Sequence, residues 1–185
     1  MGKAQFDREY VINKTVELFW KYGYNGSSMQ QVVKATGLKP GSIYLAFGSK
    51  EGLYREAIES YSKKNFKNTV NIIESAPDVL KGIIILLEKM IEDSIKSNYK
   101  SCFSIKTQLE QNDKNLNDLA GEHLIQREVL IESYLSQIFP PELSKSRATS
   151  IMLHMYGLRV YGYHKQGYEN IKNGLKEGLP WLPWD

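Results

Sequence analysis

The fold of this chain is decided by residues 23–53, which have the sequence GYNGSSMQQVVKATGLKPGSIYLAFGSKEGL. Ser28 and Gln31 have the spacing of a capping box, in which the serine oxygen and the glutamine amide each satisfy an amide group at a helix start. Gly37 ends that short helix, and Pro40 begins another, because a first helical turn tolerates the missing N–H of proline. Two short helices joined by a glycine-bearing turn are the elements of a helix-turn-helix.

Helical patterns extend outward from this stretch over nearly the whole chain. Apolar residues recur at helical intervals over residues 6–22, and Ser49 is placed to cap a further helix that follows the helix-turn-helix. No sustained alternation of apolar and polar residues predicts a strand. The chain is therefore predicted to be all-α, with a three-helix helix-turn-helix domain followed by a larger helical bundle. Beyond about residue 68 the pattern changes to longer helices, expected at about 76–98, 101–111, 116–138 and 143–166, and a glycine-interrupted tail follows them.

The composition is that of a soluble globular protein, with 185 residues of which 42% are hydrophobic and 24% charged. The single cysteine excludes an internal disulfide framework and a zinc cluster of thiolates alone, and it fits a reducing compartment. The longest apolar run, residues 83–87, is far shorter than the ~20 residues of a membrane span, and the amino terminus carries charge throughout. The sequence thus predicts a cytoplasmic protein with no membrane partner.

The net charge of +3 is unevenly distributed. Residues 1–67 carry 11 Lys and Arg against 6 Asp and Glu, a net charge of +5, whereas residues 68–185 carry a net charge of −2. A positive segment on a near-neutral body indicates an anionic partner, with nucleic acid first and an anionic membrane surface second.

The second short helix of the helix-turn-helix has side chains suited to DNA on the face that its core residues leave outward. Ser42 can bond a base edge, Leu45 and Ala46 can meet a thymine methyl, and Gly41 allows the backbone to come close. Other polar side chains near this face suit phosphate oxygens, which set register without reading sequence. The predicted DNA-binding residues are Ser27, Ser28, Lys39, Pro40, Gly41, Ser42, Tyr44, Leu45, Ala46 and Lys50.

The ordered positions of this stretch resemble the amino-terminal DNA-binding domain of the tetracycline-repressor-like (TetR/AcrR) transcriptional regulators. The shared pattern comprises a glycine–aromatic pair, a Ser/Thr pair, Gly-Ser-Ile-Tyr at 41–44, a phenylalanine at 47 and Lys-Glu-x-Leu at 50–53. Two positions depart from it: Lys39 replaces a small cap, which could alter the operator that is read, and Val33 replaces a common alanine. The resemblance covers about residues 5–65.

This resemblance implies a DNA-binding domain at 1–67, with the helix-turn-helix at about 28–47, and a ligand-binding and dimerisation domain at 68–185. It implies a homodimer on a pseudo-palindromic, double-stranded operator, with the two helix-turn-helix units about one helical turn apart. A small-molecule effector in the larger domain would release the DNA, so the expected function is that of a ligand-responsive repressor. No cofactor and no metal site are expected, because His123 and His164 lack partners at ligand-like spacing.

Candidates for the effector pocket and the dimer surface follow from residue type and pattern, and each has a simpler alternative. Aromatic residues in a bundle are more often core than pocket, a lone cysteine such as Cys102 is more often a packed hydrophobe than a sensor, and His154 is more often a core or interface residue. The effector candidates are Met90, Tyr99, Cys102, Phe103, Gln108, His154 and Tyr156, and the dimer candidates are Leu124, Ile131, Leu135, Ile151, Met155 and Leu158.

Other functions remain open at this point. No nucleophile with a base, no glycine-rich phosphate loop and no paired metal ligands are visible, so an enzyme is not expected. A helical interaction module that works without DNA and an activator that no ligand releases are the alternatives to a repressor. The sequence names neither the effector nor the operator.

Overall fold

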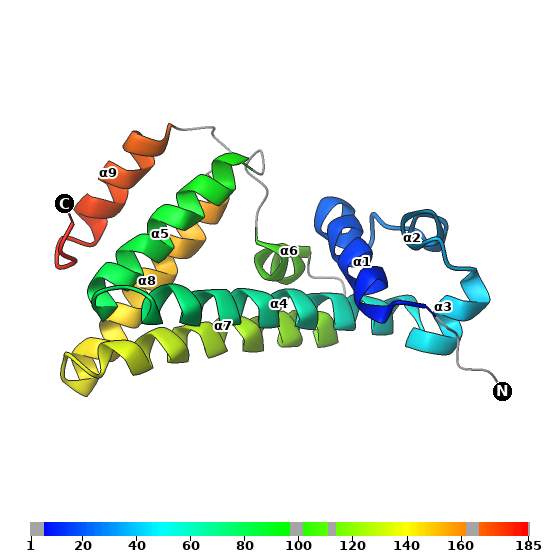
Figure 1. The fold of residues 1–185 in the computed structure, drawn as a ribbon, viewed down its shortest axis with the longest axis horizontal. Coiled ribbons are helices and arrows are strands. Elements are labelled where there is room, and N and C mark those ends of the chain that lie inside the picture. The colour runs from blue at the N-terminus through cyan, green and yellow to red at the C-terminus, as the bar shows by residue number, and fades with distance from the viewer. Residues whose placement is uncertain (1–5, 97–101, 111–113, 162–166, 185) are drawn as a thin grey trace. The chain divides into compact units, whose positions relative to one another are not determined.

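A computed structural model of the chain describes residues 6–96, 102–110, 114–161 and 167–184 (Figure 1). These residues form nine α-helices joined by short connections, and none of them lies in a strand, as the all-α prediction requires. The helices are α1 (Arg8–Tyr22), α2 (Met29–Thr36), α3 (Pro40–Phe47), α4 (Lys50–Glu74), α5 (Val79–Lys96), α6 (Phe103–Glu110), α7 (Lys114–Leu135), α8 (Pro141–Tyr161) and α9 (Tyr168–Gly178).

The chain divides into two compact units. The first unit comprises Met1–Lys64 together with Phe103–Gly121, and the second comprises Asn65–Cys102 together with Glu122–Asp185. Helices α4 and α7 each contribute residues to both units. The compact units are therefore discontinuous in sequence, whereas the sequence predicts two continuous domains that meet at residue 67. The functional assignment of those two domains stays a prediction.

The first unit is built around the helix-turn-helix. Helices α1 and α2 pack against each other, and Phe19, Val32 and Ile43 place one fully buried side chain from each of α1, α2 and α3 in a shared core. Tyr54 on α4 and Phe103 on α6 are also fully buried there. Because all three helices of the motif share one core with α4, α3 is held in a fixed position.

The second unit has its core between α5, α8 and α9, which pack against one another (Figure 1). The tail after α9 folds back on this unit, with Leu182 buried and the Trp184 indole N–H donating to the Leu179 carbonyl at 2.9 Å. The Arg147 guanidinium lies 4.3 Å from the Trp181 ring centroid. Such a cation over an aromatic face is a favourable contact, so the tail is an ordered part of the bundle.

Three helices differ from their predicted extents. Helix α4 continues without a break to Glu74, past residue 68, beyond which the pattern of longer helices was expected. Helix α8 begins at Pro141 and is described to Tyr161, and α7 ends at Leu135 rather than near residue 138. In the part of the chain that the structure describes, no helix combines the length and the apolar character that a bilayer span needs.

Candidate nucleic-acid interface

Helix α2 begins and ends with the local features that its sequence predicts. The Ser28 hydroxyl accepts from the Gln31 amide at 3.2 Å, and the Gln31 side chain accepts from the Ser28 amide at 2.7 Å, which completes the capping box. Gly37 ends α2 with φ +73°, a left-handed conformation that glycine adopts without steric cost. These bonds fix the start of α2 and the point at which the chain leaves it for α3.

Helix α3 has one buried face and one exposed face. Ile43 and Phe47 are buried, whereas Tyr44 is 48% exposed and Leu45 75% exposed. Apolar surface exposed to water is unfavourable in the free protein. An exposed leucine next to an exposed tyrosine on a rigidly held helix is therefore expected of a surface that binds a partner. The rest of the exposed or half-exposed face consists of Lys39, Pro40, Gly41, Ser42 and Ala46.

The amino end of α3 favours an anion. Lys39 is exposed and makes no side-chain cap bond, and the first turn has no acidic residue. A helix amino terminus carries a partial positive charge from its aligned peptide dipoles. A cap residue that adds a full positive charge at this end gives a site suited to a phosphate oxygen.

The serines and the lysine predicted to bind phosphate differ in their surroundings. Ser28 is exposed and caps α2, but Ser27 is 3% exposed and its hydroxyl donates to the Gly23 carbonyl at 2.6 Å. Ser27 therefore closes the turn between α1 and α2 rather than facing outward. Its residue type gave no sign of this role, because the same hydroxyl could serve either purpose.

Lys50, at the start of α4, is half-buried beside the same turn. Its ammonium lies 4.4 Å from the centroid of the Tyr24 ring. The pKa of Lys50 is lowered because burial disfavours the charged form, an effect that the Glu110 carboxylate partly offsets. The ring positions the cation, and the carboxylate helps to keep it charged.

Helix α6 holds the α1–α2 turn, a feature that the sequence did not predict. The Lys106 ammonium donates to the Trp20 and Lys21 carbonyls, each at 3.0 Å, and so caps the end of α1. The Glu110 carboxylate accepts from the Tyr24 amide at 2.9 Å. A Cβ atom at Gly23 would lie 1.8 Å from that carboxylate, and Gly23 has φ +75°. The turn therefore favours glycine at position 23 for its backbone conformation, and the missing side chain leaves room for the Glu110 carboxylate.

A buried tyrosine links α4 to the same helix. The Tyr54 and Thr107 hydroxyls bond at 2.7 Å, and the Tyr54 ring lies 5.2 Å from that of Phe103 in an edge-to-face contact. Burial raises the pKa of Tyr54 well above its ordinary value, so the phenol stays neutral. Phe103 was predicted to line an effector pocket, but its side chain is fully buried in this core.

The other effector candidates are not gathered around one cavity. Met90 and Cys102 are buried, Gln108 is exposed on α6, and Tyr99 lies outside the described residues. Burial raises the pKa of the Tyr156 phenol, and Cys102 and Arg127 both lie within electrostatic reach of it.

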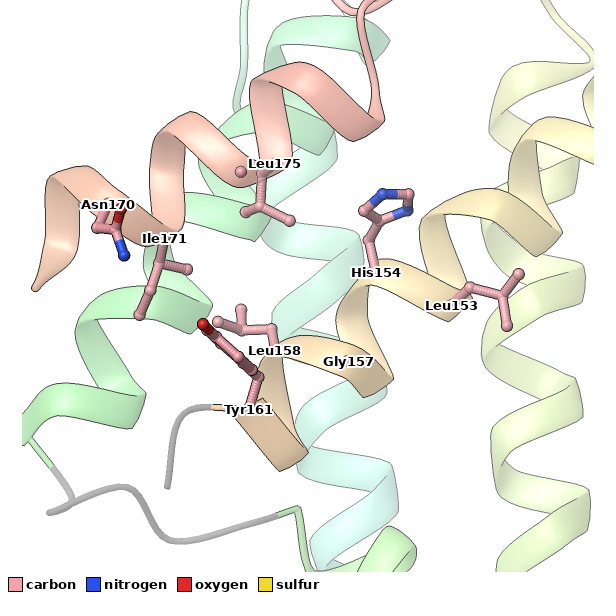
Figure 2. Close-up of a pocket in the computed structure, with 9 residues that line it drawn as sticks. Leu153, His154, Gly157, Leu158, Tyr161, Asn170, Ile171 and Leu175 are labelled. Carbon is pink, nitrogen blue, oxygen red and sulfur yellow. The ribbon is translucent and has the colours of Figure 1, made fainter. Parts of the chain in front are cut away.

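In the part of the chain that the structure describes, the effector candidate His154 lines an open cavity. An open cavity of about 620 Å³ lies between α8 and α9, and Figure 2 shows the side chains of His154 and Leu158 projecting from α8 toward α9. The His154 ring nitrogen Nδ1 bonds the Ser150 carbonyl at 2.8 Å. The full lining is Leu153, His154, Gly157, Leu158 and Tyr161 from α8 and Asn170, Ile171, Gly174 and Leu175 from α9.

The predicted dimer residues are mostly enclosed by the chain itself. Of the six, Leu124 is half-buried, and the other five are buried within the core of the second unit. A side chain already packed in its own core has little surface to offer a second copy, so burial does not favour these residues, and the dimer assignment stays a prediction. The exposed apolar residues of α8 are instead Leu143, Leu153, Val160 and Tyr161. The buried candidates are Ile131, Leu135, Ile151, Met155 and Leu158.

Comparison with known proteins finds a family match within the first unit. Residues 11–57 match the family described as bacterial regulatory proteins, tetR family. The chain is 41% identical over 56 residues to the HTH-type transcriptional repressor ComR of Escherichia coli (strain K12), over 30% of this chain and 27% of ComR. It is 27% identical over 115 residues to the uncharacterized HTH-type transcriptional regulator YezE of Bacillus subtilis (strain 168), over 60% of this chain and 58% of YezE. The matched region thus spans less than two thirds of the length of either relative.

Solved structures extend the likeness to nearly the whole fold. A cysteine mutant of the TetR family transcriptional regulator CifR, complexed with 26-bp double-strand operator DNA, superposes with a TM-score of 0.85 at 21% identity and covers 99% of this chain and 100% of CifR. A TetR family transcriptional regulator from Cytophaga hutchinsonii gives a TM-score of 0.83 at 18% identity, over 98% of this chain and 97% of that one. At these identities the likeness establishes the fold.

Proposed function

The chain belongs to the tetR family of bacterial regulatory proteins, and from that premise we propose that it is a DNA-binding transcriptional repressor. It acts by binding, without catalysis, on double-stranded operator DNA. The observation that carries this proposal is the divided face of α3, with Ile43 and Phe47 buried while Tyr44 and Leu45 are exposed. A helix fixed by its core and bearing polar and apolar side chains outward is what entry into a major groove requires.

The residues of the exposed face have separate roles in this proposal. Ser42 and Leu45 meet base edges, and Tyr44, Lys39 and Lys50 bind phosphates on either side. The relative ComR is itself named a transcriptional repressor, and the CifR structure holds operator DNA. These relatives support the same role here.

The repressor is a homodimer in which α8 and α9 meet a second copy. Leu153 and Tyr161 project from α8 beside the cavity, and a side chain added at Gly157 or Gly174 would meet open space. Exposed apolar side chains next to residues without side chains suit the close approach of another helix. Two copies related by a twofold axis then present two α3 helices to a pseudo-palindromic operator.

A small-molecule effector binds in the second unit and lowers the affinity for DNA. Cys102 and Tyr156 are predicted effector residues within electrostatic reach of each other, and Tyr156 is also within reach of Arg127. An effector releases DNA only to the extent that it binds the non-DNA-binding geometry more tightly.

The proposal is tested by measuring DNA affinity on a fragment that the unaltered protein selects from random DNA. We expect Ser42→Ala to relax the preference for one base position at a cost of roughly 1–3 kcal/mol, and Lys39→Ala to weaken binding to all sequences and reduce the salt slope by about one. Lys145→Ala removes the same charge from an exposed position on α8 and serves as the control. Unchanged affinity in both α3 variants would contradict the proposal.

A further inference from the structure

Helix α3 is weakly stabilised by its own sequence. It has eight residues, its cap residue Lys39 makes no side-chain bond, and its last turn has no basic residue to interact with the helix dipole. Helices this short are marginal without tertiary support. The position of α3 therefore depends on groups supplied by other helices.

One such group is Arg8, the first residue of α1. Its Nε atom donates to Glu56 Oε2 at 3.1 Å, and its Nη2 atom donates both to Glu56 Oε1 and to the Ala46 carbonyl, the latter at 3.3 Å. The guanidinium carbon also lies 4.4 Å from the centroid of the Phe47 ring. Arg8 thus joins the carboxyl end of α3 to both α1 and α4.

This arrangement supplies what α3 lacks. Ala46 is in the last turn of α3, so the guanidinium places a positive charge at the negative end of the helix dipole. The planar fork of arginine binds the Glu56 carboxylate in two places, which fixes its orientation in a way that a lysine ammonium does not. The Phe47 ring that contacts the Arg8 guanidinium also packs against Phe6, whose ring centroid lies 6.2 Å from that of Phe47.

We propose that Arg8 is a positioning residue for DNA reading, which sets the orientation of α3 through Ala46 and Phe47 while Glu56 holds its guanidinium in place. The inference rests on the proposed DNA-binding function. Its Nε and Nη2 donors are bonded to Glu56 and Ala46, so these donors are assigned to holding α3 rather than to a phosphate. Arg8 therefore contributes to the choice of sequence rather than to general affinity for the DNA backbone.

The test compares Arg8→Ala, Arg8→Lys and Glu56→Gln with the unaltered protein on two DNA probes. The probes are the fragment selected by the unaltered protein from random DNA and a scrambled fragment of equal length. We expect Arg8→Ala to lower the affinity for the selected fragment on the order of tenfold, which is comparable to losing one well-placed base contact. The affinity for the scrambled fragment and the salt dependence of binding should stay nearly unchanged. Arg8→Lys restores the charge but not the orientation, so it recovers little of the loss.

Glu56→Gln separates the positioning role from a phosphate contact by the sign of its effect. If Arg8 positions α3, Glu56→Gln weakens binding to the selected fragment. If Arg8 instead binds phosphate, removing its carboxylate partner strengthens binding to both fragments. In that case Arg8→Ala weakens binding to both fragments equally and makes the salt slope smaller by about one. Arg8→Lys would then recover the affinity. That pattern would overturn the inference. Glu59→Gln removes the same charge from the same groove beside α1 and is the matched control.

Hydrogen exchange tests the same inference without DNA. We expect the amides of residues 43–47 in α3 to exchange faster in Arg8→Ala and Glu56→Gln, with those of residues 32–36 in α2 unchanged. Equal protection of α3 in all variants would refute the positioning role. If the unaltered protein selects no DNA, the proposed function fails, and the exchange measurement still decides whether Arg8 holds α3.

Discussion

At the scale of single residues, the side chains of the helix-turn-helix divide into a buried core and an exposed face on α3. Val32, Ile43 and Phe47 are buried, whereas Leu45, which the helical spacing predicts on the outward face, is 75% exposed. Ser27 was not predictable in the same way. Its role depends on a bond to the Gly23 carbonyl, and a serine hydroxyl suits that bond as well as it suits a phosphate.

Gly82 offers a residue-scale prediction about stability. It is buried on α5, and a Cβ atom there would lie 2.8 Å from the Cα atom of Ile73 near the end of α4. Because backbone cannot move aside as a flexible side chain can, we expect Gly82→Ala to lower the free energy of unfolding by roughly 1–3 kcal/mol. Urea denaturation followed by circular dichroism measures this change.

Gly41→Ala is the matched control for that experiment. A Cβ atom at Gly41 would meet nothing within 4 Å, and alanine favours a helix over glycine by up to about 1 kcal/mol. The control should therefore leave stability unchanged or raise it. Equal stability of the unaltered protein and Gly82→Ala would show that α4 and α5 are not packed as closely as described.

At the scale of elements, local sequence signals were sufficient to predict where helices end. They did not predict contacts between residues far apart in the sequence. The capping box of α2 and the glycines after α1 and α2 lie within a few residues of the bonds they make, so the sequence was sufficient. Helix α6 was expected in the larger domain, yet it packs in the first unit through residues more than 80 positions away from their partners. Periodicity identifies the buried face of a helix but not the helix it packs against.

The contacts of α6 give a prediction at this scale. Lys106→Met keeps the apolar stem but removes the cation from the Trp20 and Lys21 carbonyls at the end of α1. We expect the free energy of unfolding to fall by about 1 kcal/mol, the contribution of a charged group bonded at a helix carboxyl end. Lys145→Met on exposed α8 should change stability by less than about 0.5 kcal/mol. An equal effect of both changes would mean that α6 does not brace the α1–α2 turn.

At the scale of the whole molecule, the sequence could not separate intrachain core from a surface between copies. Ile131, Ile151 and Met155 were chosen for the dimer because they are apolar and regularly spaced, and they are buried within one chain. A buried helix face has the same pattern whether its cover is another helix of the chain or a second copy. Only exposure in the folded chain distinguishes the two.

The proposed dimer therefore predicts that an exposed residue of α8, rather than the buried candidates, is sensitive to substitution. Leu153 on α8 and Leu109 on α6 have nearly equal exposure, 65% and 66%. We expect Leu153→Glu to convert the dimer to a folded monomer, because it places a charge where apolar side chains meet the second copy, while Leu109→Glu leaves the dimer intact. Sedimentation velocity gives both masses. A dimer that survives Leu153→Glu would place the interface elsewhere.

The most direct test of the central claim is selection of binding sites from random double-stranded DNA by the unaltered protein. If α3 reads the major groove in a symmetric pair, the enriched sequences form an inverted repeat whose half-sites lie about one helical turn apart. If no sequence is enriched over the starting pool, the chain does not read DNA, and the proposed repressor function is wrong.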